Sequence, residues 1–240
     1  MSQIVTATPQ HFAHLRDKFV TIVAFGDSIT AINHCTHGGH NWTGYLWMGL
    51  YEVFPNGFTI INSGIGGNHL AQGLVRLERD VLRFDPDIAI ISYGMNDVSS
   101  TTPEIFGQQL TEAIRRIREH NACSIILRTP NPMVDMWSGK EQKTVPQDGA
   151  MVPRDLAPFA EAIREVSREQ DTLLVDHYAL WTESMKSPCY GDFLALMHDP
   201  VHPNELGHRR LYHEIAPVFN AYRNFFYEWE RVLSDQCKVA

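Results

Sequence analysis

The sequence predicts an α/β fold in which a mainly parallel sheet is covered by helices on both faces. Five short apolar runs rich in β-branched residues recur along the chain, and stretches with helical spacing separate them. None of the five runs alternates cleanly between polar and apolar residues. Continuous apolar runs are typical of strands buried on both faces, and their alternation with helices is typical of a doubly wound sheet.

The five apolar runs are the expected strands of this sheet. Each is too short to be an average helix, and each ends where the chain becomes polar. They cover residues 20–25, 58–62, 87–93, 124–129 and 172–175.

Four helices are expected where apolar residues recur three and four positions apart. Their apolar stripes are Leu70, Leu74, Leu77 and Val81; Phe106, Leu110, Ala113, Ile114 and Ile117; Leu156, Phe159, Ala160, Ile163 and Val166; and Leu211, Ile215, Val218, Tyr222 and Phe226. Thr102 has the position of an N-cap before the second helix, and Pro103 that of its first residue. Pro217 predicts a kink in the fourth.

Two polar stretches interrupt this alternation, at residues 31–44 and 130–153. We expect both to be loops, and long loops in compact domains are usually functional or disordered. Both leave the carboxyl end of a predicted strand, and ligands of open α/β sheets bind outside those ends. The two loops therefore indicate where a ligand site lies.

Size, charge and cysteine content limit the class of protein. The simplest interpretation of 240 residues without a repeat or linker is a single domain over residues 1–240. A net charge of −8 disfavours a broad nucleic-acid surface, and no run approaches the ~20 apolar residues of a membrane span. The first 19 residues lack a signal-peptide pattern, and four scattered cysteines favour free thiols, so we expect a cytoplasmic protein.

Chemically active side chains follow several of the predicted strands. Ser28 follows the first and Asn96 the third, while Asp199 and His202 come before the last helix. A serine hydroxyl needs a base within hydrogen-bond reach, and the base needs a carboxylate to orient it. The spacing predicts that His202 activates Ser28 and that Asp199, three residues before it, orients His202.

An acyl-transfer site also needs hydrogen-bond donors for the negative oxygen of its tetrahedral intermediate. The backbone N–H groups of Ser28 and Gly67 and the side-chain amide of Asn96 are the expected donors. A glycine at position 67 lets the backbone approach the oxygen without a side chain in the way.

The chain resembles the SGNH hydrolases, also called the GDSL family of esterases and lipases. Four blocks carry the resemblance in order, with Ile29 replacing the usual leucine of the first: residues 26–29 (GDSI), 62–68 (NSGIGGN), 94–97 (GMND) and 199–203 (DPVHP). The resemblance implies a three-layer, flavodoxin-like α/β/α sandwich. It also implies ester or thioester hydrolysis without a cofactor, with a catalytic triad of Ser28, Asp199 and His202 and an oxyanion hole at Ser28, Gly67 and Asn96.

These observations predict a serine esterase that works through an acyl-serine intermediate. The polar crevice favours a short acyl group, such as acetate on a carbohydrate or small alcohol, with Asn68, Trp42 and Trp137 as substrate-binding residues. Cleavage of lysophospholipids or acyl thioesters is the alternative within the enzyme class. A non-catalytic ligand-binding module on an esterase scaffold is the alternative outside it.

Other polar residues have plainer interpretations. We expect Asp27 and Asp97 to bond nearby backbone N–H groups. The loop segment with His34, Cys35, His37 and His40 has loose spacing for a metal site, so we interpret its histidines as solvated and expect no metal or cofactor. Trp42, Tyr45, Trp47, Met48 and Tyr51 have helical spacing and favour the core.

The expected partner is a small-molecule ester, with no nucleic acid. A homo-oligomer is compatible with the aromatic segment 221–233, which could pack on this domain or on a second copy.

Overall fold

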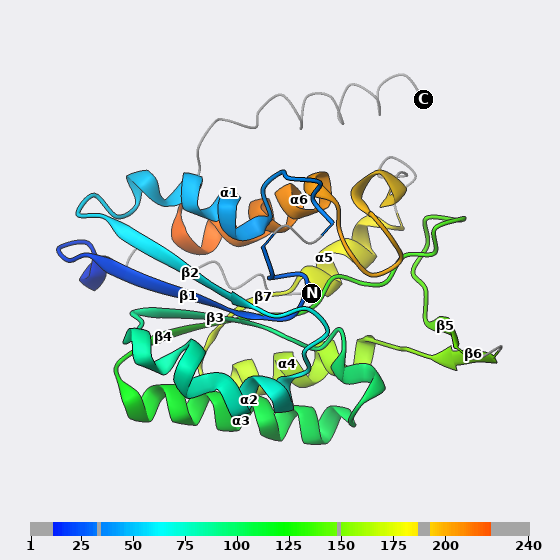
Figure 1. The fold of residues 1–240 in the computed structure, drawn as a ribbon, viewed down its shortest axis with the longest axis horizontal. Helices are drawn as coiled ribbons and strands as arrows, with labels where there is room; N and C mark the ends of the chain where they lie inside the picture. Colours follow the sequence, from blue (N-terminus) through cyan, green and yellow to red (C-terminus); the bar gives the residue numbers. More distant parts are fainter. Residues whose placement is uncertain (1–11, 33–34, 148–149, 187–192, 222–240) are drawn as a thin grey trace.

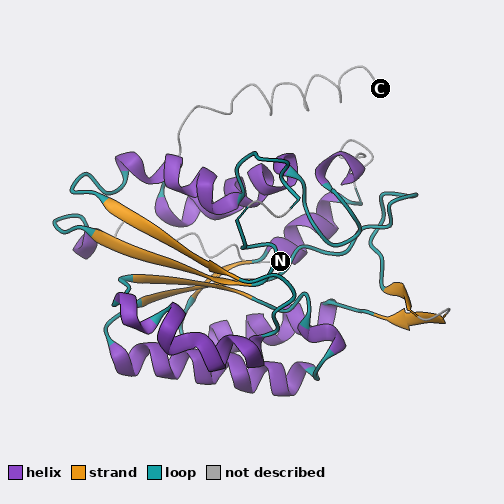
Figure 2. Ribbon diagram, viewed as in Figure 1, coloured by secondary structure: helices purple, strands orange, loops and turns teal. Residues whose placement is uncertain are grey.

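Five parallel strands form one sheet with the order β2-β1-β3-β4-β7 (Figures 1 and 2). The computed structural model describes residues 12–32, 35–147, 150–186 and 193–221. The strands are β1 (Val20–Gly26), β2 (Phe58–Gly64), β3 (Ile88–Ser92), β4 (Ser124–Arg128) and β7 (Leu173–Val175). All five predicted strands are confirmed, and their shared direction brings their carboxyl ends to one edge.

Helices cover both faces of the sheet, which gives three layers (Figure 1). On one face lie α2 (Leu70–Asp80), α3 (Pro103–His120) and α4 (Ala157–Glu169), and on the other lie α1 (Trp42–Gly49), α5 (His177–Ser184) and α6 (Glu205–Ile215). Short 3₁₀ helices occupy Ala13–Leu15, Leu50–Glu52, Leu82–Phe84, Asp97–Ser99, Phe193–Leu196 and Ala216–Phe219. Strands β1, β3, β4 and β7 are thus almost entirely buried between the two helical layers, which explains their continuous apolar runs, whereas the edge strand β2 is half-buried.

Most helix boundaries follow the predicted signals. Thr102 caps α3 through its side chain, and Pro103 is the first helical residue. The expected kink at Pro217 is instead an end: α6 stops at Ile215 and a 3₁₀ turn follows. Proline lacks the N–H that would continue the α-helix, so the turn tightens there. Tyr222 and Phe226 of the predicted stripe lie outside the described residues.

Two further departures concern segments without a clear period. The loop expected over residues 130–153 contains a short antiparallel hairpin of β5 (Thr144–Gln147) and β6 (Ala150–Pro153), which stands apart from the main sheet (Figure 2). Only the first part of the aromatic stripe is core, because Trp42 and Tyr45 of α1 are buried, whereas Trp47 and Met48 of α1 and Tyr51 of the next 3₁₀ helix are exposed.

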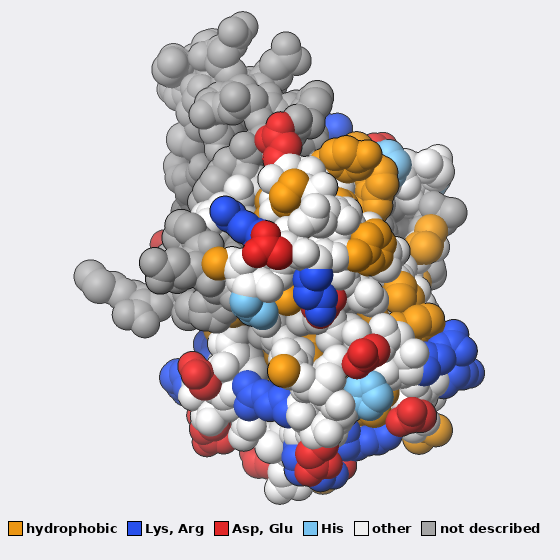
Figure 3. Space-filling model, turned by 90° about the vertical axis from the view of Figure 1, so that its left-hand side faces the viewer, with side chains coloured by type: hydrophobic (Ala, Val, Ile, Leu, Met, Phe, Trp, Pro, Cys, Tyr) orange, Lys and Arg blue, Asp and Glu red, His pale blue; other side chains and the backbone are white. Residues whose placement is uncertain are grey.

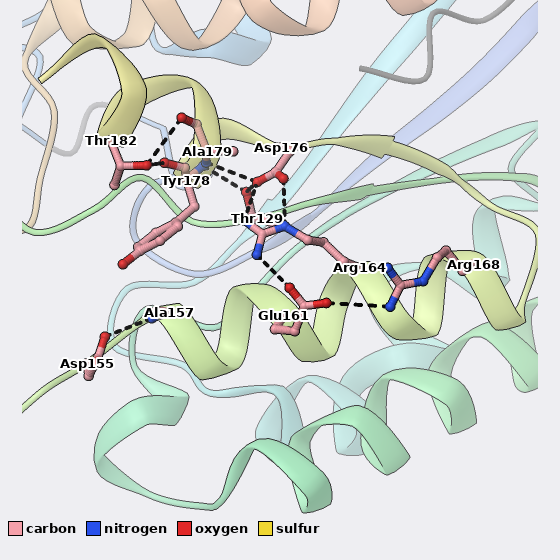
Figure 4. Close-up of polar contacts among 10 residues, drawn as sticks. All are labelled: Thr129, Asp155, Ala157, Glu161, Arg164, Arg168, Asp176, Tyr178, Ala179 and Thr182. Carbon is pink, nitrogen blue, oxygen red and sulfur yellow. Dashed lines mark hydrogen bonds and ion pairs between the residues drawn. The ribbon is translucent and has the colours of Figure 1, made fainter. Parts of the chain in front are cut away.

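A buried carboxylate fixes the helix that follows β7. Asp176 caps α5 by accepting from the Ala179 N–H and also accepts from the Thr129 hydroxyl, 3.0 Å away (Figure 4). Arg164 of α4 donates to both Asp176 oxygens, at 2.7 and 3.1 Å. The carboxylate therefore joins the ends of β4 and β7 to helices in both layers.

The molecular surface carries charges of both signs. On the face shown in Figure 3, Lys and Arg side chains are interspersed with Asp and Glu, so its described part forms no continuous basic surface for a phosphate backbone. Among the described helices, none has the length and apolar character that a membrane crossing requires.

Candidate active site

A hydrogen-bonded relay of three side chains lies at the carboxyl edge of the sheet. Ser28 lies just after β1, and its Oγ is 2.9 Å from Nε2 of His202. The Nδ1 atom of His202 is 2.8 Å from Oδ2 of Asp199, in the turn before α6. The structure therefore brings together, in the predicted order, three residues that are up to 174 positions apart.

The turn that carries the imidazole is held by its own backbone. Oδ1 of Asp199 accepts the N–H groups of Val201 and His202, each at 2.8 Å, and the N–H of His198 donates to the His202 carbonyl at 2.8 Å. Partial burial alone would raise the pKa of Asp199, but the hydrogen bonds from His202 and Val201 hold it below its ordinary value. Asp199 is therefore an anion at neutral pH, suited to orienting the imidazole.

The turn that carries Ser28 packs closely against the end of β3. Oδ1 of Asp27 accepts the Ile29 N–H at 2.9 Å, as predicted for a structural aspartate. A Cβ atom added to Gly26 would lie 2.4 Å from Oγ1 of Thr30 and 2.6 Å from the Ser92 carbonyl oxygen. Only glycine fits this position, so steric contact with β3 fixes the backbone that presents Ser28.

The glycine turn after β2 lies beside the serine. A Cβ atom added to Gly66 would lie 4.0 Å from Cβ of Ser28, and Gly67 has a left-handed φ of +74° with open space around its Cα. The side-chain amide of Asn96 donates to the Asn68 carbonyl at 3.0 Å. The three segments expected to form an oxyanion hole are therefore adjacent.

Asp97 ties this third segment to α2. Its carboxylate accepts the N–H of Leu70 at 2.8 Å and that of Gly94 at 3.0 Å, which confirms the structural role predicted for it. Burial raises the pKa of Asp97 above its ordinary value, against these two hydrogen bonds.

Arg76 is a residue that the sequence analysis missed. It is 8% exposed, and all five guanidinium N–H groups donate to the protein. The acceptors are the carbonyl oxygens of Gly26 and Ser63, Oδ1 of Asn68, the carboxylate of Asp80 and the hydroxyl of Tyr93. A charged residue on the otherwise apolar face of α2 was the available signal.

Trp42 does not lie where a substrate could touch it. Its side chain is 0% exposed, and the Arg128 guanidinium lies 3.9 Å above its ring. Arg128 is itself buried and donates through Nε to Nε2 of His177 at 2.8 Å. The structure therefore gives Trp42 a packing role in place of the predicted substrate contact, because its ring is fully buried and stacks against the Arg128 guanidinium.

The other two predicted substrate residues are accessible to different degrees. Asn68 is half-buried, and its Oδ1 accepts from Nε of Arg76 at 3.0 Å. Trp137 is 95% exposed in a turn where Asp135 accepts the N–H groups of Trp137 and Ser138. Neither side chain is excluded from contact with a ligand.

The histidine-rich loop is only partly described. His34 lies outside the described residues, His37 lies against the His198 ring, and His40 lies against the Tyr45 ring, with centroids 5.0 and 5.6 Å apart. His37 and His40 are exposed, as predicted for solvated histidines.

Comparison with known proteins gives one family match over most of the chain. The model of the GDSL-like lipase/acylhydrolase family matches residues 24–210, a range that contains the complete relay.

Curated relatives and solved structures agree with this match. An acetylxylan esterase of Geobacillus stearothermophilus is 28% identical over 88% of this chain and 95% of its own length, and the uncharacterized lipoprotein YqeF of Bacillus subtilis (strain 168) is 28% identical over 68% and 72%. The crystal structure of Axe2, an acetylxylan esterase from G. stearothermophilus, superposes with a TM-score of 0.67 at 23% identity, over 85% of this chain and 97% of that one. Its variants with a serine, an aspartate or a histidine replaced by alanine are described as catalytic mutants.

The buried Asp27 generates a prediction about stability and pH. Burial raises the pKa of Asp27 from 3.8 to about 7, so the folded protein holds this proton more tightly than the unfolded chain. The contribution to stability is complete at low pH and is lost as the pH rises through about 7. Asp27→Asn cannot ionise, so we expect its free energy of unfolding relative to wild type to increase between about pH 5 and about pH 8.

Urea denaturation of both proteins at each pH measures this difference. An equal difference between wild type and variant at both pH values would contradict the assignment. Asp135→Asn, at an exposed turn, is the control, because burial does not raise the pKa of that carboxylate above its ordinary value.

Proposed function

Because the chain belongs to the GDSL-like lipase/acylhydrolase family, a family of ester hydrolases, we propose that Ser28, His202 and Asp199 are its catalytic triad. The observation that carries the proposal is the continuous relay, with 2.9 Å between Ser28 and His202 and 2.8 Å between His202 and Asp199. Both distances suit proton transfer between heavy atoms. The catalytic mutants of Axe2 involve the same three residue types, which supports the assignment.

The reaction proceeds in two acyl-transfer steps. His202 accepts the proton of Ser28 as Oγ attacks the ester carbon, and it then gives that proton to the departing alcohol. A water molecule, activated by the same imidazole, attacks the acyl-serine and releases the acid. Asp199 holds the imidazole in the required tautomer and stabilises the imidazolium that forms in each step.

Negative charge on the substrate oxygen is stabilised by the adjacent N–H groups. We assign the Ser28 N–H, the Gly67 N–H and the Asn96 side-chain amide to this role. The open backbone at Gly67 and the position of Asn96 against the Asn68 carbonyl support the assignment. Such donors stabilise the transition state more than the ground state, because the charge develops only there.

The proposed substrate is an acetyl ester on a carbohydrate hydroxyl. The acetylxylan esterase relative spans 88% of this chain, and its activity is the one that the polar site suits. The proposed contacts are the half-buried Asn68 side chain with a sugar hydroxyl and the exposed indole of Trp137 with the face of a sugar ring. The cytoplasmic location expected from the sequence stays a prediction, and one of the relatives is a lipoprotein.

Loss of the nucleophile tests the mechanism. Ser28→Ala removes the attacking oxygen, so kcat for p-nitrophenyl acetate should fall by about 10³–10⁶-fold while the fold is retained. Steady-state kinetics and circular dichroism measure the two effects. Ser124→Ala, at the start of β4 and therefore at the opposite edge of the sheet, is the matched control and should keep wild-type activity. An unchanged kcat in Ser28→Ala would contradict the proposed mechanism. An inactive wild type would favour the alternative of a non-catalytic ligand-binding module.

Loss of one oxyanion donor should affect turnover more than binding. Asn96→Ala removes the side-chain amide, and we expect kcat to fall by about 10²–10³-fold with little change in KM. A thermal melting curve checks that the change is not a folding defect. A variant with wild-type kcat would remove Asn96 from the oxyanion hole.

A panel of esters tests the substrate class. Rates should decrease from p-nitrophenyl acetate to the butyrate and octanoate, and acetylated xylooligosaccharides should release acetate, because the proposed site accommodates a short acyl group. Rates that rise steadily towards octanoate would instead favour an acylhydrolase for long chains.

Trp137→Ala tests the proposed contact with the sugar. It should raise KM for the acetylated oligosaccharide and leave KM for p-nitrophenyl acetate unchanged.

A further inference from the structure

A thiol, an imidazole and a carboxylate converge beside the catalytic relay. Cys35 lies in the loop after β1, and His198 and Asp199 lie in the turn before α6. One potential ligand atom of each residue lies within 4.8 Å of those of the other two. Sulfur, nitrogen and oxygen ligands together form a set that Zn²⁺ binds in proteins. The catalytic role proposed above uses only Asp199 of the three.

The three ligand atoms, within 4.8 Å of one another, lie somewhat farther apart than on a bound ion. In a tetrahedral site, a Zn–S bond of about 2.3 Å and a Zn–N bond of about 2.1 Å place the two ligand atoms about 3.6 Å apart. Binding therefore requires rotation of the Cys35 and His198 side chains. His198 is exposed and Cys35 is half-buried, so an ion from solvent can reach them.

Both backbone segments are already ordered by hydrogen bonds. On one side, the His198 N–H donates to the His202 carbonyl at 2.8 Å, and Met197 pairs with Pro203. On the other, the N–H of Gly39 donates to the Thr36 carbonyl at 2.9 Å, directly after Cys35. The ligands are therefore held near one another without a large rearrangement of the chain.

The carboxylate has a position left for a cation. Oδ1 of Asp199 accepts two backbone N–H groups, whereas Oδ2 accepts from the His202 imidazole. An ionised carboxylate oxygen has two lone pairs, so Oδ2 can bind a metal while it keeps its hydrogen bond to His202. A water molecule can occupy the fourth position of a tetrahedral site.

We propose that Cys35, His198 and Asp199 form an inhibitory site for a thiophilic divalent cation such as Zn²⁺. On binding, the Cys35 S–H bond breaks, a Zn–S bond forms and the proton leaves to solvent, with no change of oxidation state.

The effect on activity rests on the proposed function. A cation at Oδ2 offsets the negative charge with which Asp199 stabilises the imidazolium of His202. The transition state, in which His202 is protonated, is therefore destabilised more than the ground state, and turnover decreases.

Cobalt binding tests the site without relying on activity. Titration of the wild-type protein with Co²⁺ should give a near-ultraviolet sulfur-to-cobalt charge-transfer band, and Zn²⁺ should abolish it by competition. Cys35→Ser should lack this band, and Cys35→Ser and His198→Ala should each weaken Zn²⁺ binding in calorimetry by at least about 10–100-fold. Cys123→Ser and His120→Ala, which change the same residue types away from this cluster, are the matched controls and should bind as wild type.

Inhibition is then measured with p-nitrophenyl acetate. Micromolar Zn²⁺ should slow the wild type and both controls, whereas Cys35→Ser and His198→Ala should keep their full rates. Equal metal affinity in wild type and Cys35→Ser, or a wild type without the charge-transfer band, would overturn the proposal whether or not the protein hydrolyses esters. An inactive wild type that still shows the cysteine-dependent band would contradict the proposed function alone.

Discussion

The guanidinium of Arg76 is the interaction on which the geometry of this site depends. It joins the backbone at the ends of β1 and β2, through Gly26 and Ser63, to the side chain of Asn68. An arginine that is 8% exposed would be costly without partners, but here every donor is used, and Asp80 compensates the charge. The serine turn and the glycine turn are thereby held at a fixed separation.

Around this fixed part, two kinds of constraint position the residues of the proposed triad. Ser28 is placed by the sheet, because its turn follows a strand buried between two helical layers. His202 is placed by a turn that the Asp199 carboxylate closes through two backbone N–H groups. The Asp199 carboxylate therefore has two structural effects. It closes the turn before α6, and it also fixes the orientation of the His202 imidazole.

The sequence predicted the elements whose physics is local and missed those that depend on tertiary contacts. The five strands and the capped start of α3 follow from apolar runs and from Thr102 and Pro103, and motif order located the relay. Nothing in the local pattern around Trp42 indicates that Arg128, 86 positions later, would cover its ring. Likewise α5 has no regular apolar stripe, and its start is fixed by Asp176. The partners of Asp176 are Thr129, directly after β4, and Arg164 of α4.

The absence of space around Gly26 has a consequence for how such a protein can change. Because a side chain at that position would collide with Thr30 and the Ser92 carbonyl, the sheet itself sets the position of Ser28. The hairpin of β5 and β6 and the turn bearing Trp137 stand outside the sheet. Evolution, or a protein engineer, can therefore exchange these outer segments without displacing Ser28, whereas moving Ser28 would require rebuilding the central strands.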